Sequence, residues 1–528
     1  MQFSKLVSSL PEKNGAIHFL ERGAPAQRSY KTFYEDICKA RAQLIGWGVG
    51  PGIRVGIYAP NSYSWLVHDL ALIDIGAISV PFTDDFSDSI NDGLLDKYSI
   101  GLLLLSKSTA RLFPNRPAHV ALIDGENAVV QVRSRPPSIE PDTDDQHSLV
   151  FSSGSAGGLK GLVISRNGVA STLPPIIEAL GIAGGDRLIL FLPLSNFQQR
   201  YLCYAALWYD FDIILTEYTQ LFLAIEKLNP SVLLAPPVFF QMMHAEFLKF
   251  PLFKRVLWKV LGHVIDLVPI SSTRSRLARQ FFPEFYRQFG NNIRMLITGM
   301  APIRRNIGQF FSLMQLPLCE AYGMVEAGVI AFRPGNCRMH GSVGKPVRGV
   351  NLSFDSEGEI VVTRENPLTL RYFQCAKDEN ERTFVGRNTI ATGDIGRVDG
   401  DGNLYLLGRK RETIVTSGGI KINPEAIEEE INNCADVANA VVFWQPDTAQ
   451  LSCVVELNDL EDQEARSRVQ TLANNLKTTR KLRQPMTAVF ATEHFSKENG
   501  MLRPNMKIDR RQIVARYGTD LRPNSVSR

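Results

Sequence analysis

Helix-forming and strand-forming segments alternate along the first part of the chain, and this alternation restricts the folds that it can adopt. Residues 32–48 (TFYEDICKARAQLIGWG) carry apolar side chains at helical spacing and end in glycine. Residues 54–60 (RVGIYAP) are typical of a buried strand, residues 64–77 of a second helix and residues 78–82 (ISVPF) of a second strand. Strand, helix and strand at this spacing predict a parallel sheet covered by helices. The same rhythm recurs at residues 187–237.

A run of six small residues separates two β-rich segments within residues 150–164 (VFSSGSAGGLKGLVI). Loops without side chains let several backbone N–H groups face one anion, so a phosphate is the expected ligand. The P-loop pattern of nucleotide-binding proteins fails here, because Leu159 stands at its second glycine and Gly161 at its metal-binding hydroxyl. Taken alone, the segment favours a tight connection between two strands.

The alternating pattern of helices and strands changes from Asn403 onward. Residues 403–415 (NLYLLGRKRETIV) predict two short strands joined by a charged link, and Asn423 and Pro424 begin an amphipathic helix. The last ~117 residues are enough for a compact α+β unit of ordinary domain size. We therefore expect a large N-terminal domain over residues 1–408 and a small C-terminal domain over 413–528, with the boundary between them at 409–412.

Composition argues against several functional classes. The 58 basic and 54 acidic residues give a net charge of +4, which is too balanced to favour a nucleic-acid partner. The seven cysteines are scattered and never spaced as C-x-x-C, which argues against a zinc or iron–sulfur site and favours a reducing compartment. No stretch approaches the ~20 apolar residues of a membrane span, and residues 1–20 lack a signal-peptide core, so we expect a cytoplasmic protein.

Four further stretches follow the small-residue segment in order: EAYGMVEAG (320–328), GSVGKPVRGV (341–350), ATGDIGRVDGDGNLYLLGRKRETIVTSGGIKINPEAIEEEI (391–431) and RPNMKIDRRQI (503–513). In this order they resemble the acyl-adenylate-forming superfamily, which includes acyl-CoA synthetases, adenylation domains of nonribosomal peptide synthetases and firefly luciferase. Residues 150–164 are similar to that family's [ST]-[ST]-G-[ST]-[ST]-G-x-P-K-G element. The resemblance covers most of the chain, since two early segments, GVGPGIRVGIYAPNSYSW and GAISVPF, are similar to the family's N-terminal pattern.

The resemblance implies an α/β fold: a large N-terminal domain of layered α/β subdomains with parallel-rich sheets, and a small mobile α+β C-terminal domain. It implies that ATP, with Mg²⁺, and a carboxylic acid form an acyl-adenylate. The acyl group would then pass to the thiol of CoA or of a carrier-protein phosphopantetheine. Because this reaction brings an anion onto a polyanion, catalysis must consist mainly of positioning and charge neutralisation.

By the same resemblance, the small-residue loop binds the β- and γ-phosphates of ATP. Its hydroxyls and backbone N–H groups would hold the phosphates through Ser152, Ser153, Gly154, Ser155 and Gly157. Glu326 would hold the Mg²⁺ ion that bridges the phosphates. Lys507 would approach the α-phosphate and the attacking carboxylate. The expected catalytic residues are therefore Lys507, Glu326 and Lys160, the last adding a positive charge beside the loop.

The resemblance also implies how the nucleoside is bound. Tyr322 would stack on adenine, and Gly323 would leave room beside it. The other face of adenine would lie along residues 298–303 (TGMAPI), against Gly299, Ala301 and Pro302. Asp394 would bind both ribose hydroxyls, and Arg409 would reach the ribose or a phosphate.

Further implied positions concern the acid and the thiol. Arg411 occupies the hinge position about which the small domain is expected to rotate. After rotation, Gly418 and Gly419 would line the passage for a pantetheine thiol, while Asn196 and Phe197 would lie near the acyl group.

The acid is expected to be fatty or aromatic. Residues 193–199 (PLSNFQQ) offer no carboxylate to pair with an α-ammonium group, and residues 233–243 (LLAPPVFFQMM) are apolar. Residues 253–282 resemble the insertion of long-chain fatty acyl-CoA synthetases and carry six basic side chains that could rest on an anionic membrane: Lys254, Arg255, Lys259, Arg274, Arg276 and Arg279. An ordinary pair of surface helices is the alternative.

Five positions depart from the family pattern and keep other hypotheses open: Ala156, Leu159, Asn196, Val325 and Met506. Losing one charge-assisted phosphate contact costs ~1.5–3 kcal/mol, which slows an enzyme without abolishing its activity. The alternatives are a degenerate nucleotide-binding homologue that regulates or scaffolds a pathway, and a luciferase-like oxygenase.

Overall fold

The structure is a computed structural model that describes residues 5–87, 89–114, 117–127, 130–133, 145–153, 159–301, 303–335, 337, 341–375, 377–415, 421–445, 450–479, 486–496, 498–502 and 508–518.

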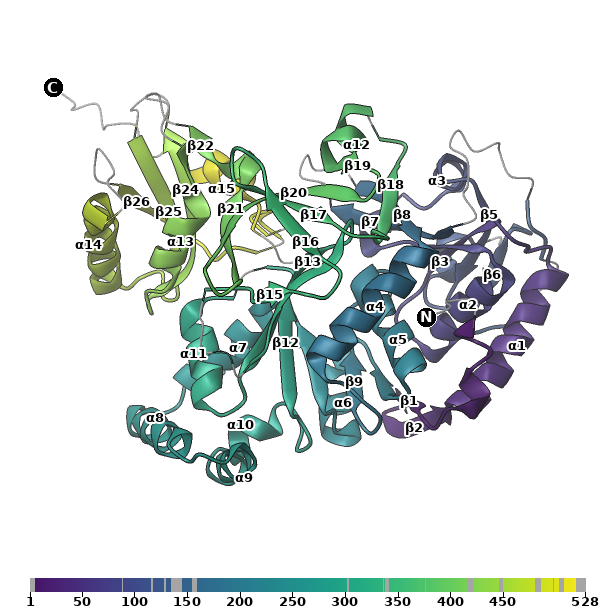
Figure 1. Ribbon diagram of the computed structural model, residues 1–528, viewed down its shortest axis with the longest axis horizontal. Helices are drawn as coiled ribbons and strands as arrows, with labels where there is room; N and C mark the ends of the chain where they lie inside the picture. Colours follow the sequence, from purple (N-terminus) through teal and green to yellow (C-terminus); the bar gives the residue numbers. More distant parts are fainter. Residues whose placement is uncertain are drawn as a thin grey trace.

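Two large sheets build the first two thirds of the chain, and both are rich in parallel pairs (Figure 1). In the seven-stranded sheet, with order β18-β8-β7-β4-β3-β5-β6, pairing is parallel from β7 to β6 and antiparallel between β7, β8 and β18. Its strands are β3 (Arg54–Tyr58), β4 (Ile78–Pro81), β5 (Ile100–Leu105), β6 (Val120–Leu122), β7 (Gln146–Ser153), β8 (Leu159–Ser165) and β18 (Thr369–Phe373).

The nine-stranded sheet has the order β15-β14-β13-β12-β11-β9-β10-β1-β2, and it is parallel from β13 to β1. Its strands are β1 (Ala16–Glu21), β2 (Ala24–Ser29), β9 (Arg187–Leu190), β10 (Asp212–Leu215), β11 (Val232–Ala235), β12 (Met295–Gly299), β13 (Leu318–Met324), β14 (Gly328–Arg333) and β15 (Lys345–Pro346). The predicted α/β class with parallel-rich sheets is confirmed by both sheets.

The two helices predicted near the N-terminus are present with ends that their cap residues explain. The first is α1 (Tyr30–Gly46), where the Ser29 hydroxyl accepts a hydrogen bond from the Thr32 backbone N–H. The second is α2 (Tyr63–Ile75), which ends where Gly76 adopts a φ of 83°, a left-handed conformation that glycine reaches without strain.

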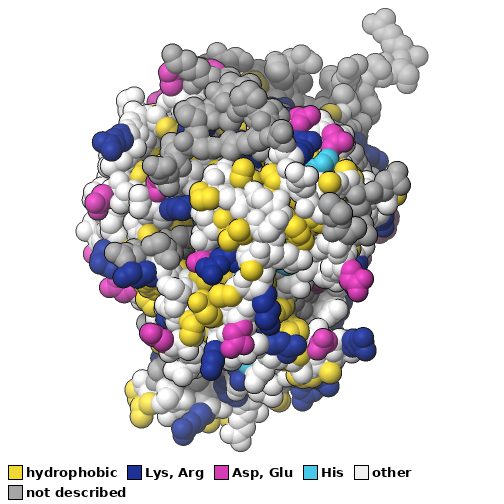
Figure 2. Space-filling model, turned by 90° about the vertical axis from the view of Figure 1, so that its right-hand side faces the viewer, with side chains coloured by type: hydrophobic (Ala, Val, Ile, Leu, Met, Phe, Trp, Pro, Cys, Tyr) yellow, Lys and Arg dark blue, Asp and Glu magenta, His cyan; other side chains and the backbone are white. Residues whose placement is uncertain are grey.

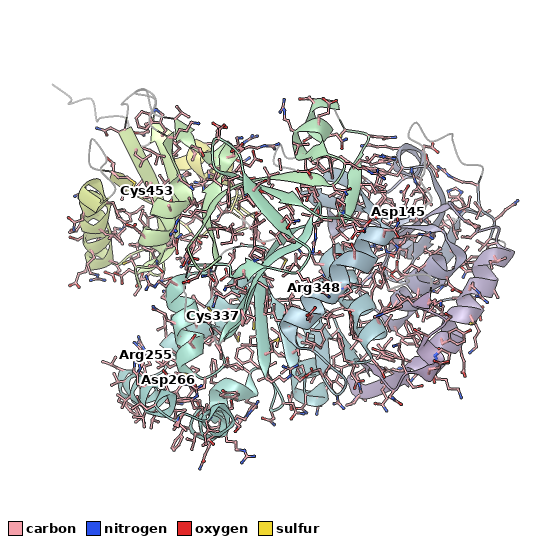
Figure 3. The ribbon with its side chains drawn as sticks, in the orientation of Figure 1. Asp145, Arg255, Asp266, Cys337, Arg348 and Cys453 are labelled. Carbon is pink, nitrogen blue, oxygen red and sulfur yellow. The ribbon has the colours of Figure 1, made fainter. Side chains whose placement is uncertain are left out.

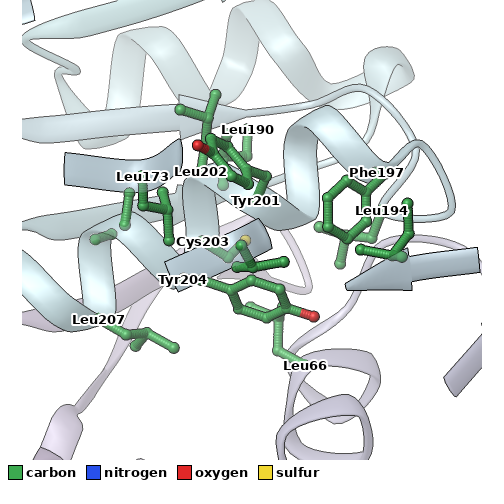
Figure 4. Close-up of a cluster of buried hydrophobic side chains, with 14 of the residues drawn as sticks. Leu66, Leu173, Leu190, Leu194, Phe197, Tyr201, Leu202, Cys203, Tyr204 and Leu207 are labelled. Carbon is green, nitrogen blue, oxygen red and sulfur yellow. The ribbon is translucent and has the colours of Figure 1, made fainter. Parts of the chain in front are cut away.

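One hydrophobic core joins the two sheets. It contains side chains from both of them and from α1, α2, α4 (Arg166–Leu180) and α5 (Phe197–Tyr209). Figure 4 shows part of this core, where Tyr201, Cys203 and Tyr204 of α5 lie among leucines of the neighbouring elements. Because ten of the thirteen residues of α5 are buried, this helix is enclosed by protein on most sides.

A third, antiparallel sheet follows, built from β16 (Asn351–Phe354), β17 (Glu359–Thr363), β19 (Phe384–Gly386), β20 (Thr389–Val398) and β21 (Leu404–Arg409). The short helix α12 (Lys377–Thr383) lies between β18 and β19 in the sequence.

The C-terminal part has its own α+β architecture and its own hydrophobic clusters, at the upper left of Figure 1. Its elements are β22 (Ile414–Val415), β23 (Lys421–Ile422), α13 (Pro424–Asn432), β24 (Val437–Gln445), β25 (Gln450–Leu457), α14 (Gln463–Thr479), β26 (Thr487–Phe490) and α15 (Arg510–Tyr517). As predicted, the Asn423 side chain caps α13 by accepting a hydrogen bond from the Glu425 backbone N–H. Leu406 packs against the large core, whereas Ile414 packs against a C-terminal cluster, so the core changes between these two residues.

A second large apolar cluster lies on the other face of the nine-stranded sheet and supports a group of helices at the lower edge of Figure 1. These helices are α6 (Leu221–Leu228), α7 (Pro237–Leu248), α8 (Leu252–Asp266), α9 (Ser271–Phe281), α10 (Pro283–Arg287) and α11 (Arg305–Leu313); α3 (Asp92–Lys97) lies beside the seven-stranded sheet. Within the described part of the chain, no helix is both long enough and apolar enough to cross a membrane.

Charge is mixed on the face turned toward the viewer in Figure 2, which is the right-hand side of the molecule in Figure 1. Acidic and basic side chains are interspersed there with apolar ones. This mixture agrees with the nearly balanced composition of the whole chain.

Candidate active site

The small-residue segment joins two antiparallel strands. In the ladder between β7 and β8, Ser152 lies opposite Lys160 and Ser153 opposite Leu159. The strand–strand connection favoured by the sequence is therefore present, and its two ends hold Ser152 and Lys160 side by side. The loop residues themselves, Gly154, Ser155, Ala156 and Gly157 among them, lie outside the described residues.

Lys160 is the first cation after that loop, and two groups hold its half-buried side chain. Its ammonium forms an ion pair with Glu379 of α12. The same nitrogen lies 4.9 Å from the ring centroid of Tyr372 on β18, within the range of a cation–π interaction. In this arrangement the Lys160 ammonium is paired with a carboxylate.

Tyr372 connects Lys160 to the expected magnesium ligand. Its hydroxyl donates a hydrogen bond of 2.8 Å to Oε1 of Glu326. Strand β18 makes the contact possible because it pairs with β8, where Tyr372 lies opposite Leu162. Lys160, Tyr372 and Glu326 therefore form one cluster, which we call the phosphate-side cluster, although two separate sequence motifs supply its charged members.

The backbone of the motif around Glu326 is fixed by the same strand. The Thr369 backbone N–H donates to the Glu326 carbonyl oxygen at 3.1 Å, and the Thr369 hydroxyl donates to the Val325 carbonyl oxygen at 2.8 Å. Burial raises the pKa of the Glu326 carboxyl, while the Tyr372 hydrogen bond and the nearby Lys160 oppose that rise.

The residues here fit a magnesium ion that is shared with a substrate. Mg²⁺ is usually bound by one or two carboxylates together with substrate phosphates and water, and not by a cage of protein ligands. The described residues contain no group of three or more His, Cys, Asp or Glu side chains that could form such a cage. Glu326, a carboxylate that Tyr372 orients through a side-chain hydrogen bond, suits this role.

A second cluster forms around Asp394. The Tyr322 hydroxyl donates a hydrogen bond of 2.7 Å to Oδ2 of Asp394, and Nε of Arg409 lies 3.4 Å from Oδ1. Asp394 and Arg409 are direct partners in the ladder of β20 and β21. Burial raises the pKa of the Asp394 carboxyl, and Arg409 and the Tyr322 hydrogen bond counteract the effect. The structure thus brings together three residues that the sequence assigned separately to adenine and ribose.

Two glycines near Tyr322 are needed for close packing. A Cβ atom on Gly323 would lie 2.4 Å from the carbonyl oxygen of Gly328 on the adjoining strand, and one on Gly299 would lie 3.0 Å from the Ala321 carbonyl oxygen. Gly299 ends β12 beside β13, and Ala301 is exposed just beyond it. These contacts explain the glycines by strand packing, independently of any nucleotide.

The residues expected near the acyl group have structural roles in the described chain. The Asn196 side chain caps α5 by accepting a hydrogen bond from the Gln198 backbone N–H. Phe197 is buried in the large core (Figure 4). Its ring centroid lies 5.1 Å from the guanidinium carbon of Arg200.

The expected hinge coincides with a short 3-10 helix, η6 (Lys410–Glu412), in which Arg411 is exposed. Lys410 next to it pairs with three carboxylates of the β16–β17 hairpin: Asp355 at 2.7 Å, Glu357 at 3.0 Å and Glu359 at 2.8 Å. The Lys410 ammonium lowers the pKa of the Asp355 carboxyl to about 2. Glu357 also pairs with Lys421, which lies beyond the hinge.

Several expected site residues lie outside the described residues, namely Gly154, Ser155, Gly157, Pro302, Gly418, Gly419 and Lys507. Conversely, Tyr372 and Glu379 were missed by sequence reasoning. Their segments carry only an alternating apolar pattern (LTLRYF) and a charged run (KDENERT), neither of which indicates a catalytic role. Their place beside Lys160 becomes visible only in the structure, where β18 pairs with β8.

Comparison with known proteins gives a consistent result. The family model described as AMP-binding enzyme matches residues 9–366. The long-chain-fatty-acid–CoA ligase FadD15 of Mycobacterium bovis is 24% identical over 540 residues, covering 90% of this chain and 89% of that protein.

Solved structures share the fold over nearly the whole chain. The anthranilate CoA ligase AuaEII, crystallised with anthranoyl-AMP, has a TM-score of 0.73 at 16% identity and covers 98% of this chain and 97% of its own. ATP-bound MatB of Rhodopseudomonas palustris has a TM-score of 0.73 at 19% identity and covers 98% of each chain.

Proposed function

Because this chain belongs to the family of AMP-binding enzymes, we propose that it is an acid–thiol ligase that activates a carboxylic acid as an acyl-adenylate. The acid's oxygen attacks the α-phosphorus of ATP, the bond to the β-phosphate oxygen breaks, and pyrophosphate leaves. The thiol sulfur of CoA or of a carrier-protein phosphopantetheine then attacks the acyl carbon, AMP leaves, and the thiol proton passes to solvent.

The phosphate-side cluster carries this proposal. Strand β18 brings a lysine, a tyrosine and a glutamate from distant segments to the end of the small-residue loop. Lys160 neutralises phosphate charge there once Glu379 releases it, and Tyr372 orients the Glu326 carboxylate. Glu326 would hold a Mg²⁺ ion, which would supply charge neutralisation for the phosphates. The charges of the cluster suit a reaction that needs positioning and charge compensation.

The Asp394 cluster supports binding of the nucleoside. Its carboxylate presents two oxygens from the middle of β20, and Tyr322 and Arg409 hold it in place. We assign ribose to Asp394 and Arg409, and adenine to Tyr322, Gly323 and the segment of Gly299, Ala301 and Pro302.

The C-terminal residues of the expected site are also part of the proposal. We assign catalysis of adenylation to Lys507 and the thiol passage to Gly418 and Gly419. The domains are 1–408 and 413–528, with a hinge at 409–412 that includes Arg411. The change of hydrophobic core between Leu406 and Ile414 supports this division.

The proposed acid is fatty or aromatic. FadD15 is named for long-chain fatty acids, and AuaEII binds an aromatic adenylate. The apolar character of the segment from β11 to α7, which includes Phe239, Phe240 and Met243, supports such an acid. We also propose a cytoplasmic location, supported by seven cysteines that are all free thiols.

Carboxylate-dependent exchange of labelled pyrophosphate into ATP tests this function. We expect exchange with at least one acid of a panel of fatty and aryl acids, and a loss of about 100-fold or more in Glu326→Gln and Lys507→Ala. Glu35→Gln, an exposed position on α1, should keep the wild-type rate. Nucleotide binding without exchange for any acid would instead support the non-catalytic homologue, and the choice of thiol follows from turnover with free CoA against a carrier protein.

A further inference from the structure

Helix α12 brings a carboxylate to the phosphate-side cluster from a segment that lies outside the motifs of the sequence. Glu379, in the first turn of α12, forms an ion pair with the ammonium of Lys160 on β8. Both side chains are partly buried, with exposed fractions of 17% for Lys160 and 29% for Glu379. Partly buried charges are screened less by water and salt than charges on an open surface. Glu379 therefore holds the Lys160 ammonium more firmly than a fully exposed carboxylate would.

Strand β18 determines where α12 lies. The helix is at the upper edge of the molecule, directly after β18 in the chain (Figure 3). The Asn380 side-chain oxygen accepts a hydrogen bond of 3.0 Å from the Tyr372 backbone N–H, and the Thr383 hydroxyl lies 3.4 Å from the Tyr372 hydroxyl. Because β18 also pairs with β8, the ion pair joins two elements that are already packed against the same strand.

The charges at this place do not favour a phosphate while the ion pair is intact. Lys160 contributes one positive charge, and Glu379 and Glu326, which both act on Lys160, contribute two negative charges when they are ionised. The sum is one negative charge. Arg409 also acts on Glu326 from farther away, but it is paired with Asp394. At short range a triphosphate is repelled by Glu379 as strongly as it is attracted by a cation at the same distance.

The neighbouring acidic residue of α12 behaves differently. Asp378 pairs with Arg382 one turn later in the same helix at 2.6 Å, and both side chains are more than 60% exposed. Such a pair supports the helix itself and contributes little to the rest of the protein. Glu379, in contrast, reaches a different strand. Asp378 is therefore a suitable control for the charge of Glu379.

We propose that Glu379 sets the affinity of the site for ATP, because it competes with the nucleotide for Lys160. Without nucleotide, the Glu379 carboxylate holds the Lys160 ammonium. When Mg²⁺–ATP binds, the ammonium exchanges Glu379 for a phosphate, and α12 loses its ion pair with β8. This inference rests on the proposed function, from which it takes the contact between Lys160 and a phosphate.

The competition has a distinctive sign. A ligand that must break an internal ion pair binds more weakly than it would bind to a site whose ammonium is already available. Removing the Glu379 charge should therefore tighten ATP binding. An ion pair with only a structural role has the opposite consequence, because its loss would loosen the site and weaken ATP binding.

Equilibrium dialysis of the full chain with labelled ATP and Mg²⁺, in the absence of any acid, measures this affinity without turnover. We expect Glu379→Gln to bind ATP about 3- to 10-fold more tightly than the wild type, which is the range for a partly buried ion pair. Glutamine keeps the length of the side chain and forms helices about as well as glutamate, so the variant should fold. Asp378→Asn should bind ATP like the wild type.

Amide hydrogen exchange in α12 gives a second readout that does not depend on affinity. In the wild type, Mg²⁺–ATP should speed exchange at residues 378–383, because the helix is released from β8. In Glu379→Gln the exchange should already be fast without nucleotide, and ATP should change it little. Asp378→Asn should keep the response of the wild type to ATP.

Three outcomes would overturn the proposal: Glu379→Gln binds ATP no more tightly than the wild type, Asp378→Asn tightens binding by the same factor, or ATP leaves exchange in α12 of the wild type unchanged. A wild-type chain that binds no ATP contradicts the proposed function itself, so the two failures are distinguishable. ATP binding without pyrophosphate exchange would remove the catalytic function and leave the competition for Lys160 intact.

Discussion

Tyr372 contacts residues from two motifs that lie far apart in the sequence, and this position gives it a role that neither motif shows alone. Its hydroxyl binds the Glu326 carboxylate, and its ring lies beside the Lys160 ammonium. A hydrogen bond to the charged form of a carboxyl lowers its pKa, so Tyr372 keeps more of Glu326 ionised than burial alone would allow. We therefore regard Tyr372 as a positioning residue for the proposed metal ligand.

The variant Tyr372→Phe tests this role. Removing the hydroxyl should lower the apparent affinity for Mg²⁺–ATP about 5- to 10-fold, since one hydrogen bond to a charged group is lost. It should also raise the pKa of Glu326, so that the acid limb of the exchange rate moves to higher pH. The rate of pyrophosphate exchange, measured against Mg²⁺ concentration and against pH, gives the apparent affinity and the position of the acid limb.

Tyr405→Phe is the matched control, because it removes a tyrosine hydroxyl that interacts with Asp399 at a distant turn. Its acid limb should coincide with that of the wild type. An unchanged acid limb in Tyr372→Phe would contradict the positioning role, even if activity fell.

A second titratable residue affects stability near the hinge. Burial and the nearby Glu412 raise the pKa of Glu425 to about 7, with Arg409 opposing them. A carboxyl with a raised pKa in the folded protein contributes stability that is complete below its ordinary pKa and is lost as the pH rises through about 7. Glu425→Gln should therefore be more stable than the wild type at pH ~8, by on the order of 1 kcal/mol, and no more stable at pH ~5. Denaturant unfolding at the two pH values measures the difference, and equal gains at both would contradict it.

The sequence predicted which residues carry charge in the site, but not how they pair. Glu326, Asp394 and Tyr322 were found because each stands in a recognisable motif. Their partners were predictable only in part, because Tyr372 and Glu379 reach the site through strand pairing and the fold of α12. A local sequence pattern does not predict such long-range pairs.

At the scale of elements, β18 depends on a close contact with α4. The segment before β18 runs across the first turn of that helix, where a Cβ atom on Gly168 would lie 2.2 Å from the Pro367 carbonyl oxygen. The Ser165 backbone N–H also donates to the Leu368 carbonyl oxygen at 2.9 Å. This close approach sets the register that brings Tyr372 to Glu326.

The variant Gly168→Ala should therefore destabilise the protein by about 1–3 kcal/mol, because backbone atoms cannot yield easily to the added methyl group. Gly46→Ala is the matched control, since that glycine also lies in a helix and has no atom within 4 Å of the added Cβ. It should be neutral or stabilising by up to about 1 kcal/mol. Thermal or denaturant unfolding compares the two, and equal effects would contradict the contact argument.

Helices and buried strands of the parallel sheets were predictable because their apolar spacing is local and strong. The predicted helices at 32–48 and 64–77 match α1 and α2 to within two residues. Strand β21 lies within the two short strands predicted at residues 403–415, whereas β16 to β20 were not predicted, because they are mostly half-exposed. Their apolar patterns are too weak to be distinguished from loops.

At the scale of the whole molecule, Arg304 contributes to the contact between the large body and the C-terminal sheet. Its guanidinium donates hydrogen bonds to the carbonyl oxygens of Val437 and Ala438 on β24. On the proposed domain division, this contact holds the small domain in its present orientation.

The variant Arg304→Ala should loosen that orientation. We expect tryptic cleavage after the basic residues of 409–411 to become roughly tenfold faster, since charge-assisted hydrogen bonds across the contact are lost. Arg305→Ala, its exposed neighbour, removes one cleavage site in the same way and should leave the rate at 409–411 unchanged. Equal cleavage rates in both variants would show that Arg304 does not restrain the domain.

The arrangement of the whole chain was predictable from motif order, while the contacts that fix it were not. The resemblance placed a small C-terminal unit after residue 412, and the hydrophobic cores do separate near there. Neither Arg304 nor the three carboxylates around Lys410 lie in a motif. Contacts of this kind depend on surface shape, which a single sequence does not reveal.

The hairpin of β20 and β21 ends at Arg409, opposite Asp394, and the chain enters η6 at the next residue. Any rotation of the small domain therefore acts first on β21, whose last side chain, Arg409, supports the carboxylate that we assign to ribose. On the proposed function, AMP would leave the site in the same step in which the small domain rotates back. Turnover would then slow in proportion to the viscosity of the solvent, whereas pyrophosphate exchange would be unaffected.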